Sequence, residues 1–364
     1  MSLTDRVDAY QRRHRRAGYP IAVLYKFFDD TGGHLAALIT YYGFLSLFPL
    51  LLLASTVLGL VLSGDPHAQQ VVLSSALRQF PVIGDQLSRP ERLSGGPAGL
   101  VIGSLGALYG GLGVALAGQS AMNTIWSVPR NNRPNPVKAR ARALVLLGTV
   151  GFAVLLTTGL SAVSGGAGAL GLGLRVLTLL AAVVVNIGAF IVGFRLATAR
   201  ALSVRDVLPG AVAAAIAWQL LQLGGKSYVT RTIKHASATN SLFALVLGLI
   251  AFLYAAALIV VVCAEANAVR ADRLSPRALL TPLADNVELT PGDEKVYAKQ
   301  AAAQRSKGFE QIDVSFDKDA PRPWHHTFVV RPRATVSIAG AQRRLTAVPV
   351  RGLGVDGVGA MTPG

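Results

Sequence analysis

The chain has 364 residues, of which 52% are hydrophobic and only 15% are charged, yet its formal net charge is +16. A soluble domain carries about 25% charged residues, and a chain this apolar is not largely disordered. A disulfide scaffold is excluded because Cys263 is the single cysteine. The composition leaves an integral membrane protein or a basic soluble protein with an unusual core.

Residues 1–34 open the chain with a basic segment. Within it, residues 1–18 contain neither an apolar stretch nor a cleavage site, so we expect no cleaved signal peptide. The first apolar run would then direct insertion into the membrane.

Six apolar runs follow along the chain. A membrane-spanning helix needs about 20 mostly apolar residues to cross about 30 Å of hydrocarbon. None of the runs contains Asp, Glu or Lys, and they lack the polar face that a soluble helix shows at 3.6-residue spacing. The runs are 35–62, 98–126, 143–163, 172–194, 207–223 and 242–263. The sequence therefore predicts an all-α membrane protein with a six-helix transmembrane domain over residues 35–270.

The basic residues predict the orientation of these helices. Arginine and lysine gather in residues 1–34 and in the links after the second and fourth runs, while the links on the other side hold fewer. Under the positive-inside rule, both termini are cytoplasmic. No stretch interleaves arginine with stacking aromatic residues, so the net charge indicates orientation rather than a nucleic-acid partner.

The first run contains a proline near its middle. Pro49 removes one backbone hydrogen bond and clashes with the preceding turn, so we expect a kink near Leu45. A kinked helix can line a cavity, although a kink without a cavity is the commoner case. Together with Pro49, a few polar side chains at membrane depth are candidates for lining a pathway: Tyr41, Tyr42, Ser46, Gln119, Asn123, Asn186 and Gln219.

The second run contains small residues at four-residue spacing, which let helix backbones approach closely in lipid. This ladder consists of Gly99, Gly103, Ala107, Gly111 and Ala115. A second row beside it consists of Gly106, Gly110 and Gly118. We expect close packing of this helix on its neighbours, and the alternatives are a gating helix and a homo-oligomer formed through the ladder.

The ionisable residues at membrane depth, Arg175, Arg195 and Glu265, lie at the ends of the runs. Glu265 and Asn267 follow the sixth run, and we expect Glu265 to pair with Arg130 or Arg195 near the cytoplasmic surface. Ser203 and Asp206 have the spacing of a capping box at the start of the fifth run.

Two segments outside the runs have their own patterns. Residues 66–80 place apolar side chains on one helical face, which fits an interfacial helix or a loop that caps the bundle. In the tail, residues 271–364, the segment 291–307 begins with acids and ends with bases and is predicted to be a cytoplasmic helix. We expect disorder beyond residue 319; residues 327–330 and 335–338 have a β-type composition but are too short for a domain.

No pattern of a catalytic, metal or cofactor site accompanies these elements. The six histidines show no His-Glu-x-x-His spacing, and no nucleophile elbow, phosphate loop or zinc cysteine set is present. The sequence therefore predicts no enzyme, no cofactor and no metal, with the lipid bilayer as the main partner.

Several segments together resemble the YihY/BrkB family of bacterial integral membrane proteins. The matching segments are residues 41–50, 122–126, 208–211 with Trp218, and Tyr254 with 264–267. Residues 240–242 depart from the family, which often has Tyr-Gly there. The resemblance implies six helices in the bacterial inner membrane with both termini inside.

The resemblance also implies a limited set of functions. Transport of lipids, ions or osmolytes has been suggested for members, whereas an older ribonuclease label finds no acid/base or metal constellation here. We expect a transporter or flippase-like protein for an amphiphilic, lipid-linked or small osmolyte substrate. The alternative is a non-transporting scaffold in cell-envelope assembly.

Overall fold

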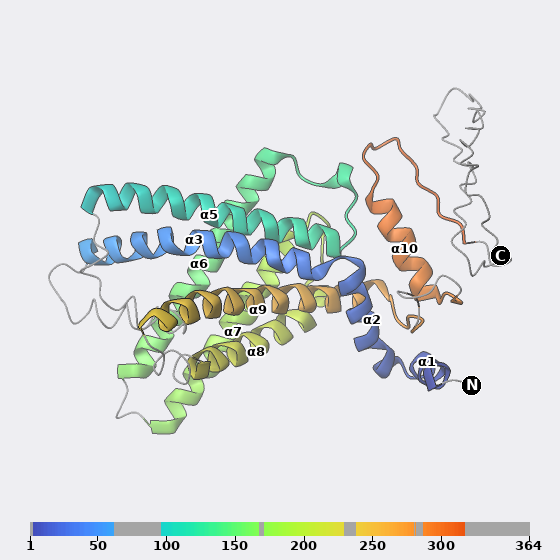
Figure 1. Cartoon of the computed structure of the whole chain (residues 1–364), viewed down its shortest axis with the longest axis horizontal. Helices are drawn as coiled ribbons and strands as arrows, with labels where there is room; N and C mark the ends of the chain where they lie inside the picture. Colours follow the sequence, from blue (N-terminus) through green and yellow to red (C-terminus); the bar gives the residue numbers. More distant parts are fainter. Residues whose placement is uncertain are drawn as a thin grey trace, which may run out of the picture.

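The computed structural model describes residues 3–61, 96–166, 171–228, 238–279, 281 and 287–316. Within these ranges the secondary structure is entirely helical. Six long helices of the described residues form a bundle (Figure 1), and each corresponds to one of the predicted apolar runs. They are α3 (Gly32–Val61), α5 (Gly96–Ile125), α6 (Pro136–Gly166), α7 (Gly171–Ala197), α8 (Val204–Tyr228) and α9 (Ala238–Asp272).

Five stretches of these helices are long and apolar enough to cross a membrane. They are Val101–Ile125, Pro136–Leu160, Val176–Ala197, Val204–Gly225 and Val246–Asp272. Large apolar side chains such as Leu105, Leu155 and Val184 are more than 60% exposed on their outer faces. Lipid tails solvate such a surface, whereas water does not. The prediction of an all-helical protein with several membrane spans is confirmed.

The helices α3 and α5 run side by side (Figure 1) because α5 presents glycine to α3. A methyl group added at Gly106 would lie 2.7 Å from Pro49, and one added at Gly110 or Gly113 would overlap Ser46 or Tyr42. The close approach therefore uses Gly106 and Gly110 of the second row, together with Gly113, instead of the first ladder.

Among the described contacts, residues of the first ladder do not form the close approach between α5 and α3. Gly111 faces Leu147 of α6, and the buried Ala115 contacts the bundle core. Gly103 and Ala107 lie on α5 before these positions, and Gly99 lies in its first turn. The four-residue spacing identified a tightly packed helix, but not the face of that helix that meets α3.

The remaining helices lie together at one end of the bundle (Figure 1). They are α1 (Leu3–Arg13), α2 (Arg15–Asp29) and α10 (Pro291–Ala303), and the short η2 (Arg130–Asn132) follows α5. The helix predicted over 291–307 thus ends four residues earlier, at Ala303. Its first turn is closed by a capping box of Thr290 and Asp293. We refer to this region, residues 3–31 with 273–316, as the polar end.

The polar end shares a small apolar core with α9. The core brings together Ala22 and Val23 of α2, Val269 of α9, Leu274 and Val296. The predicted first segment (1–34) and the start of the predicted tail (271–364) therefore pack on each other and on the bundle. Residues 66–80, 327–330 and 335–338, and the segment beyond 319, lie outside the described residues.

Candidate functional site

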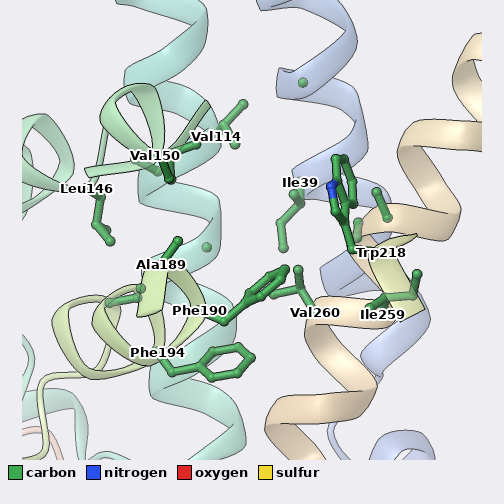
Figure 2. A pocket seen from close by; sticks show the side chains of 18 of the residues that line it. Ile39, Val114, Leu146, Val150, Ala189, Phe190, Phe194, Trp218, Ile259 and Val260 are labelled. Carbon is green, nitrogen blue, oxygen red and sulfur yellow. The ribbon is translucent and has the colours of Figure 1, made fainter. Parts of the chain in front are cut away.

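A cavity of about 420 Å³, partly open to the surroundings of the bundle, lies between its six long helices. This volume falls within the roughly 300–1,000 Å³ of small-molecule sites. Figure 2 shows Phe190 of α7 pointing across the cavity towards Val260 of α9, with Trp218 entering from α8. The labelled side chains of the wall are Ile39, Val114, Leu146, Val150, Ala189, Phe190, Phe194, Trp218, Ile259 and Val260.

The wall of the cavity is apolar apart from a few side chains. Thr40 and Thr157 donate their hydroxyl hydrogens to carbonyls one helical turn earlier, Ala36 and Ala153, at 2.8 and 2.9 Å. Asn186 is the amide side chain in the wall. Apolar cavities stay dry and take apolar ligands. The cavity is therefore chemically suited to a hydrocarbon group rather than to a charged solute.

The structure places the predicted pathway residues in three different surroundings. Asn186 lies in the cavity wall, whereas Tyr41 is 60% exposed and Gln219 is half-buried on α8. The side chains that meet the glycines of α5 are Tyr42, Ser46 and Pro49.

Gln119 and Asn123 are buried and bind backbone groups. Gln119 Nε2 donates to the Ala139 carbonyl at 3.0 Å, and Asn123 Oδ1 accepts from the Ala199 amide at 2.8 Å. Each side chain satisfies a backbone group near a helix end, which ties α5 to the start of α6 and to the end of α7.

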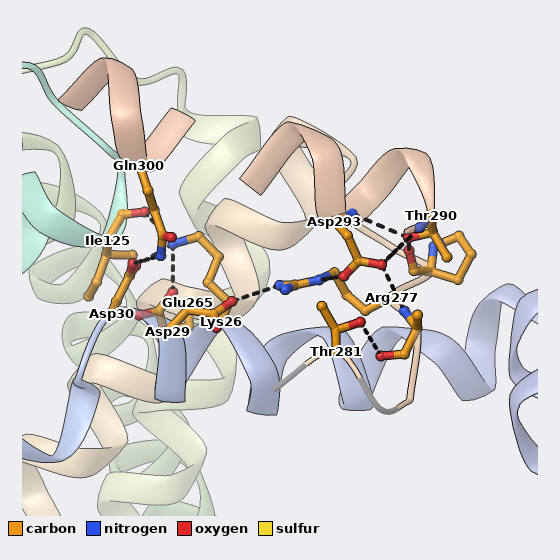
Figure 3. Close-up of polar contacts among 12 residues, drawn as sticks. Lys26, Asp29, Asp30, Ile125, Glu265, Arg277, Thr281, Thr290, Asp293 and Gln300 are labelled. Carbon is orange, nitrogen blue, oxygen red and sulfur yellow. Dashed lines mark hydrogen bonds and ion pairs between the residues drawn. The ribbon is translucent and has the colours of Figure 1, made fainter. Parts of the chain in front are cut away.

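A buried ionic cluster of Lys26, Asp30 and Glu265 lies at the polar end (Figure 3). The exposed fractions of these three residues are 2%, 6% and 0%, in the order named. Lys26 Nζ binds Asp30 Oδ2, donates to the Ile125 carbonyl at 2.8 Å and lies 3.2 Å from Glu265 Oε2. Gln300 of α10 donates to Asp30 Oδ1 at 3.2 Å. One lysine thus joins α2, α5 and α9 beneath α10.

A second cluster lies beside the first along α2 (Figure 3). The fully buried Arg277 donates through Nη1 to Asp29 Oδ2 at 2.9 Å and through Nε to Asp293 Oδ1. Asp293 Oδ2 also accepts from the Ala278 amide and the Thr290 amide, both at 3.0 Å. This arginine therefore fastens α10 to α2.

Burial and charge change the ionisation of both clusters. Burial alone lowers the pKa of Lys26, but the charges of Glu265 and Asp30 outweigh it and raise the pKa above the ordinary lysine value. The pKa of Arg277 is raised in the same way, since burial is outweighed by Asp293 and Asp29. Burial also raises the pKa of Asp29, although Arg277 acts against it.

The cluster of Lys26 lies between the cavity and α10. Met122 lines the cavity, and Ile125, three residues later on α5, binds Lys26 through its carbonyl. Val260 lines the cavity on α9, and Glu265 follows it by five residues. At 1.5 Å per residue, these intervals span about 5–8 Å along the helices. The ionic cluster therefore lies beyond the end of the cavity that faces the polar end.

The predicted ionic contacts have different partners in the structure. Glu265 pairs with Lys26 and not with Arg130 or Arg195. Arg195 donates through Nε to the Leu202 carbonyl at 2.9 Å, and Arg130 is exposed in η2. Asn267 makes no ionic contact: it accepts from the Gly210 amide at 2.8 Å and donates to the Val207 carbonyl at 3.0 Å.

Sequence reasoning missed Lys26, Asp30, Asp29 and Arg277. It counted Lys26 with the basic residues that set orientation, because a single lysine in a basic segment has no distinguishing pattern. The four-residue spacing of Lys26 and Asp30 was the available signal, since it places both on one helical face. Nothing in the sequence pattern links that face to Glu265, which lies on a helix far along the chain.

Comparison with known proteins identifies the family. Neither a curated protein nor a solved structure matches the chain. The family model described as virulence factor BrkB matches residues 23–287, which extend from α2 through the whole bundle to the start of the tail. The match includes Lys26, Asp30, Glu265 and Arg277, and it covers well over half of the chain. With its apolar helices, the chain is an integral membrane protein of the BrkB family.

Proposed function

We propose that this protein is a transporter or flippase-like protein of the bacterial inner membrane that binds the apolar part of an amphiphilic, lipid-linked molecule. The observation that carries the proposal is the cavity of about 420 Å³ between the six long helices. A binding pocket inside a membrane bundle serves an amphiphile only where the wall is as apolar as its tail. The few polar groups of the wall favour an amphiphile over an osmolyte.

The proposed topology has six spans with both termini in the cytoplasm. α3 supplies the sixth span, because its 30 residues contain no acidic residue, lysine or arginine and extend about 45 Å as a helix. The basic links after α5 and α7 lie at the polar end, where Asn131 binds Arg305 and Arg200 binds Asp272. The positive-inside rule assigns this end to the cytoplasm. The proposal includes no enzymatic step.

Two glycines in the cavity wall offer a direct test. A methyl group added at Gly118 or Gly193 would meet no other atom within 4 Å, so larger side chains there can occupy the cavity without displacing a helix. Gly148 and Gly188 are equally unobstructed but lie exposed on α6 and α7. They provide matched controls on membrane helices.

The experiment measures lipid movement between leaflets in proteoliposomes that contain a trace of a fluorescent phospholipid. Leaflet exchange is followed by chemical quenching of the outer-leaflet probe. We expect the wild type to accelerate exchange, and G118L and G193L to slow it about tenfold, which corresponds to ~1.4 kcal/mol. G148L and G188L should keep the wild-type rate. Equal rates for the filling variants and the controls would contradict the proposal.

The scaffold interpretation predicts a different result from the same protein. A scaffold moves no lipid but loses a stable partner when its tail is removed. The truncation should follow Phe316, because a deletion from Asp272 would also remove Arg277 and α10, which belong to the fold. Two results together would favour the scaffold interpretation over the transporter. The folded wild-type protein would move no lipid, and the truncated protein would lose a stable partner.

A further inference from the structure

The cluster of Lys26, Asp30 and Glu265 contains one cation and two carboxyl groups in a buried place. Lys26 is a hydrogen-bond donor to Asp30, while among the described residues neither oxygen of Glu265 receives a hydrogen bond. The 3.2 Å separation of Lys26 Nζ and Glu265 Oε2 lacks hydrogen-bond alignment. An ionised carboxylate that is buried without donors is costly. With both acids ionised, the cluster would have a net charge of −1.

We propose that this cluster is a proton-binding site, in which Glu265 takes up and releases one exchangeable proton. Uptake converts the Glu265 carboxylate into a carboxylic acid, and no other bond changes. The protonated cluster is neutral, because Lys26 then balances Asp30 alone. Release returns the proton to water.

The hydrogen bonds assign the proton to Glu265 rather than to Asp30. Asp30 accepts from Lys26 through Oδ2 and from Gln300 through Oδ1, so both of its oxygens are occupied as those of a carboxylate are. Glu265 is fully buried, receives no hydrogen bond on either oxygen, and shares the Lys26 ammonium, 3.2 Å away, with Asp30. Of the two acids, Glu265 gains more from being neutral.

The same geometry favours a proton over a metal ion. The Lys26 ammonium already lies at both carboxyl groups, so a metal ion would have to displace it, whereas a proton needs no space. In the described part of the chain, no group of three His, Cys, Asp or Glu side chains could hold a metal ion.

The charged groups that act on Glu265 are Lys26 and Asp30, both at the α2 end. From α5, the Ile125 carbonyl accepts a hydrogen bond from Lys26. From α10, the uncharged Gln300 side chain donates to Asp30. The other titratable groups nearby are engaged elsewhere. Tyr19 donates to the Ala266 carbonyl at 2.7 Å, and Asp272 binds Arg200 and Lys299.

Infrared difference spectroscopy of the full-length protein in lipid nanodiscs, recorded across pH steps, tests the site with the proton itself as probe. A protonated carboxyl group has a C=O band that an ionised one lacks. We expect such a band in the wild type well above pH 4.3, the ordinary value for glutamic acid. It should disappear in E265Q and persist in E310Q, which changes an exposed glutamate.

A second variant uses the charge balance of the cluster. D30N leaves Lys26 opposite Glu265 alone, so the cluster is neutral without a proton and the band should vanish at a lower pH than in the wild type. Labelling the glutamate carboxyl carbons with ¹³C in the wild type assigns the band to glutamate without any substitution. This measurement decides the assignment even if E265Q does not fold.

Two results would contradict the proposal that Glu265 binds the proton. One is the absence of any carboxylic-acid band above the ordinary glutamate range, which would show Glu265 ionised. The other is a band that survives in E265Q or does not shift with the label, which would place the proton elsewhere.

Coupling of this proton to lipid movement rests on the proposed function. If lipid moves, E265Q should remove the pH dependence of the rate, whereas G193L should lower the rate at every pH. A pH-independent rate in the wild type would overturn the coupling, while the spectroscopic result judges the proton site separately from transport.

Discussion

The middle of the bundle and the polar end are held together by different forces. In the middle, close contacts form where α5 presents glycine to Pro49 and Ser46, and larger apolar side chains face outward. At the polar end, Lys26 and Arg277 are buried and each binds two carboxyl groups. The two regions meet where Lys26 binds the Ile125 carbonyl at the end of α5.

This difference follows from the solvent of each region. Lipid tails are as apolar as the helices, so the middle gains stability from shape and close backbone approach. At the polar end, water competes for every charge. A buried charge is stable there only where ion pairs and hydrogen bonds offset the free energy lost on leaving water. Substitutions should therefore act through volume in the middle and through charge balance at the polar end.

The largest effect should come from Arg277→Met. The change keeps an apolar stem but leaves the buried Asp293 and the partly buried Asp29 without their cation. Removing one partner of a buried ion pair costs about 3–5 kcal/mol. We expect a clear fall in the melting temperature of the detergent-solubilised protein, and proteolytic release of α10 before the bundle unfolds.

The matched control is Arg140→Met, which changes an exposed arginine on α6. It should leave both measurements near the wild-type values. If the two variants were equally stable, the proposed role of Arg277 as the fastening of α10 would be wrong.

A smaller effect is expected from Gly110→Leu in the middle of the bundle. A side chain at this position overlaps Ser46, so α3 and α5 must move apart. Overpacking of this kind costs about 1–3 kcal/mol. Thermal unfolding should show the loss, whereas G148L, on an exposed and unobstructed position, should unfold like the wild type.

The smallest effect concerns the pH dependence of stability through Lys26. Its pKa is raised above 10.5 in the folded protein, so its contribution to stability is complete below pH 10.5 and is lost as the pH rises through the folded value. Unfolding temperatures measured from neutral to strongly alkaline pH should fall more steeply for the wild type than for K26M. Lys138→Met, at an exposed position, should follow the wild-type curve.

Much of the fold could be predicted because its signals are local. The apolar runs exceed the membrane thickness and became helices, and the spacing of Ser203 and Asp206 predicted their capping box, in which Asp206 binds the Ser203 amide at 2.9 Å. The site was less predictable. Gln119 and Asn123 are polar at membrane depth, yet they bind backbone groups, and only their neighbours reveal it.

The sequence alone therefore determined an all-helical, membrane-embedded chain, because the length and polarity of a segment decide whether it can lie in lipid. Tertiary structure decided which polar residues matter. Glu265 meets Lys26, and not a nearby arginine of the links, because α2 packs against the end of α9 and delivers the lysine there. Such a pairing depends on the positions of two distant helices, which no local pattern encodes.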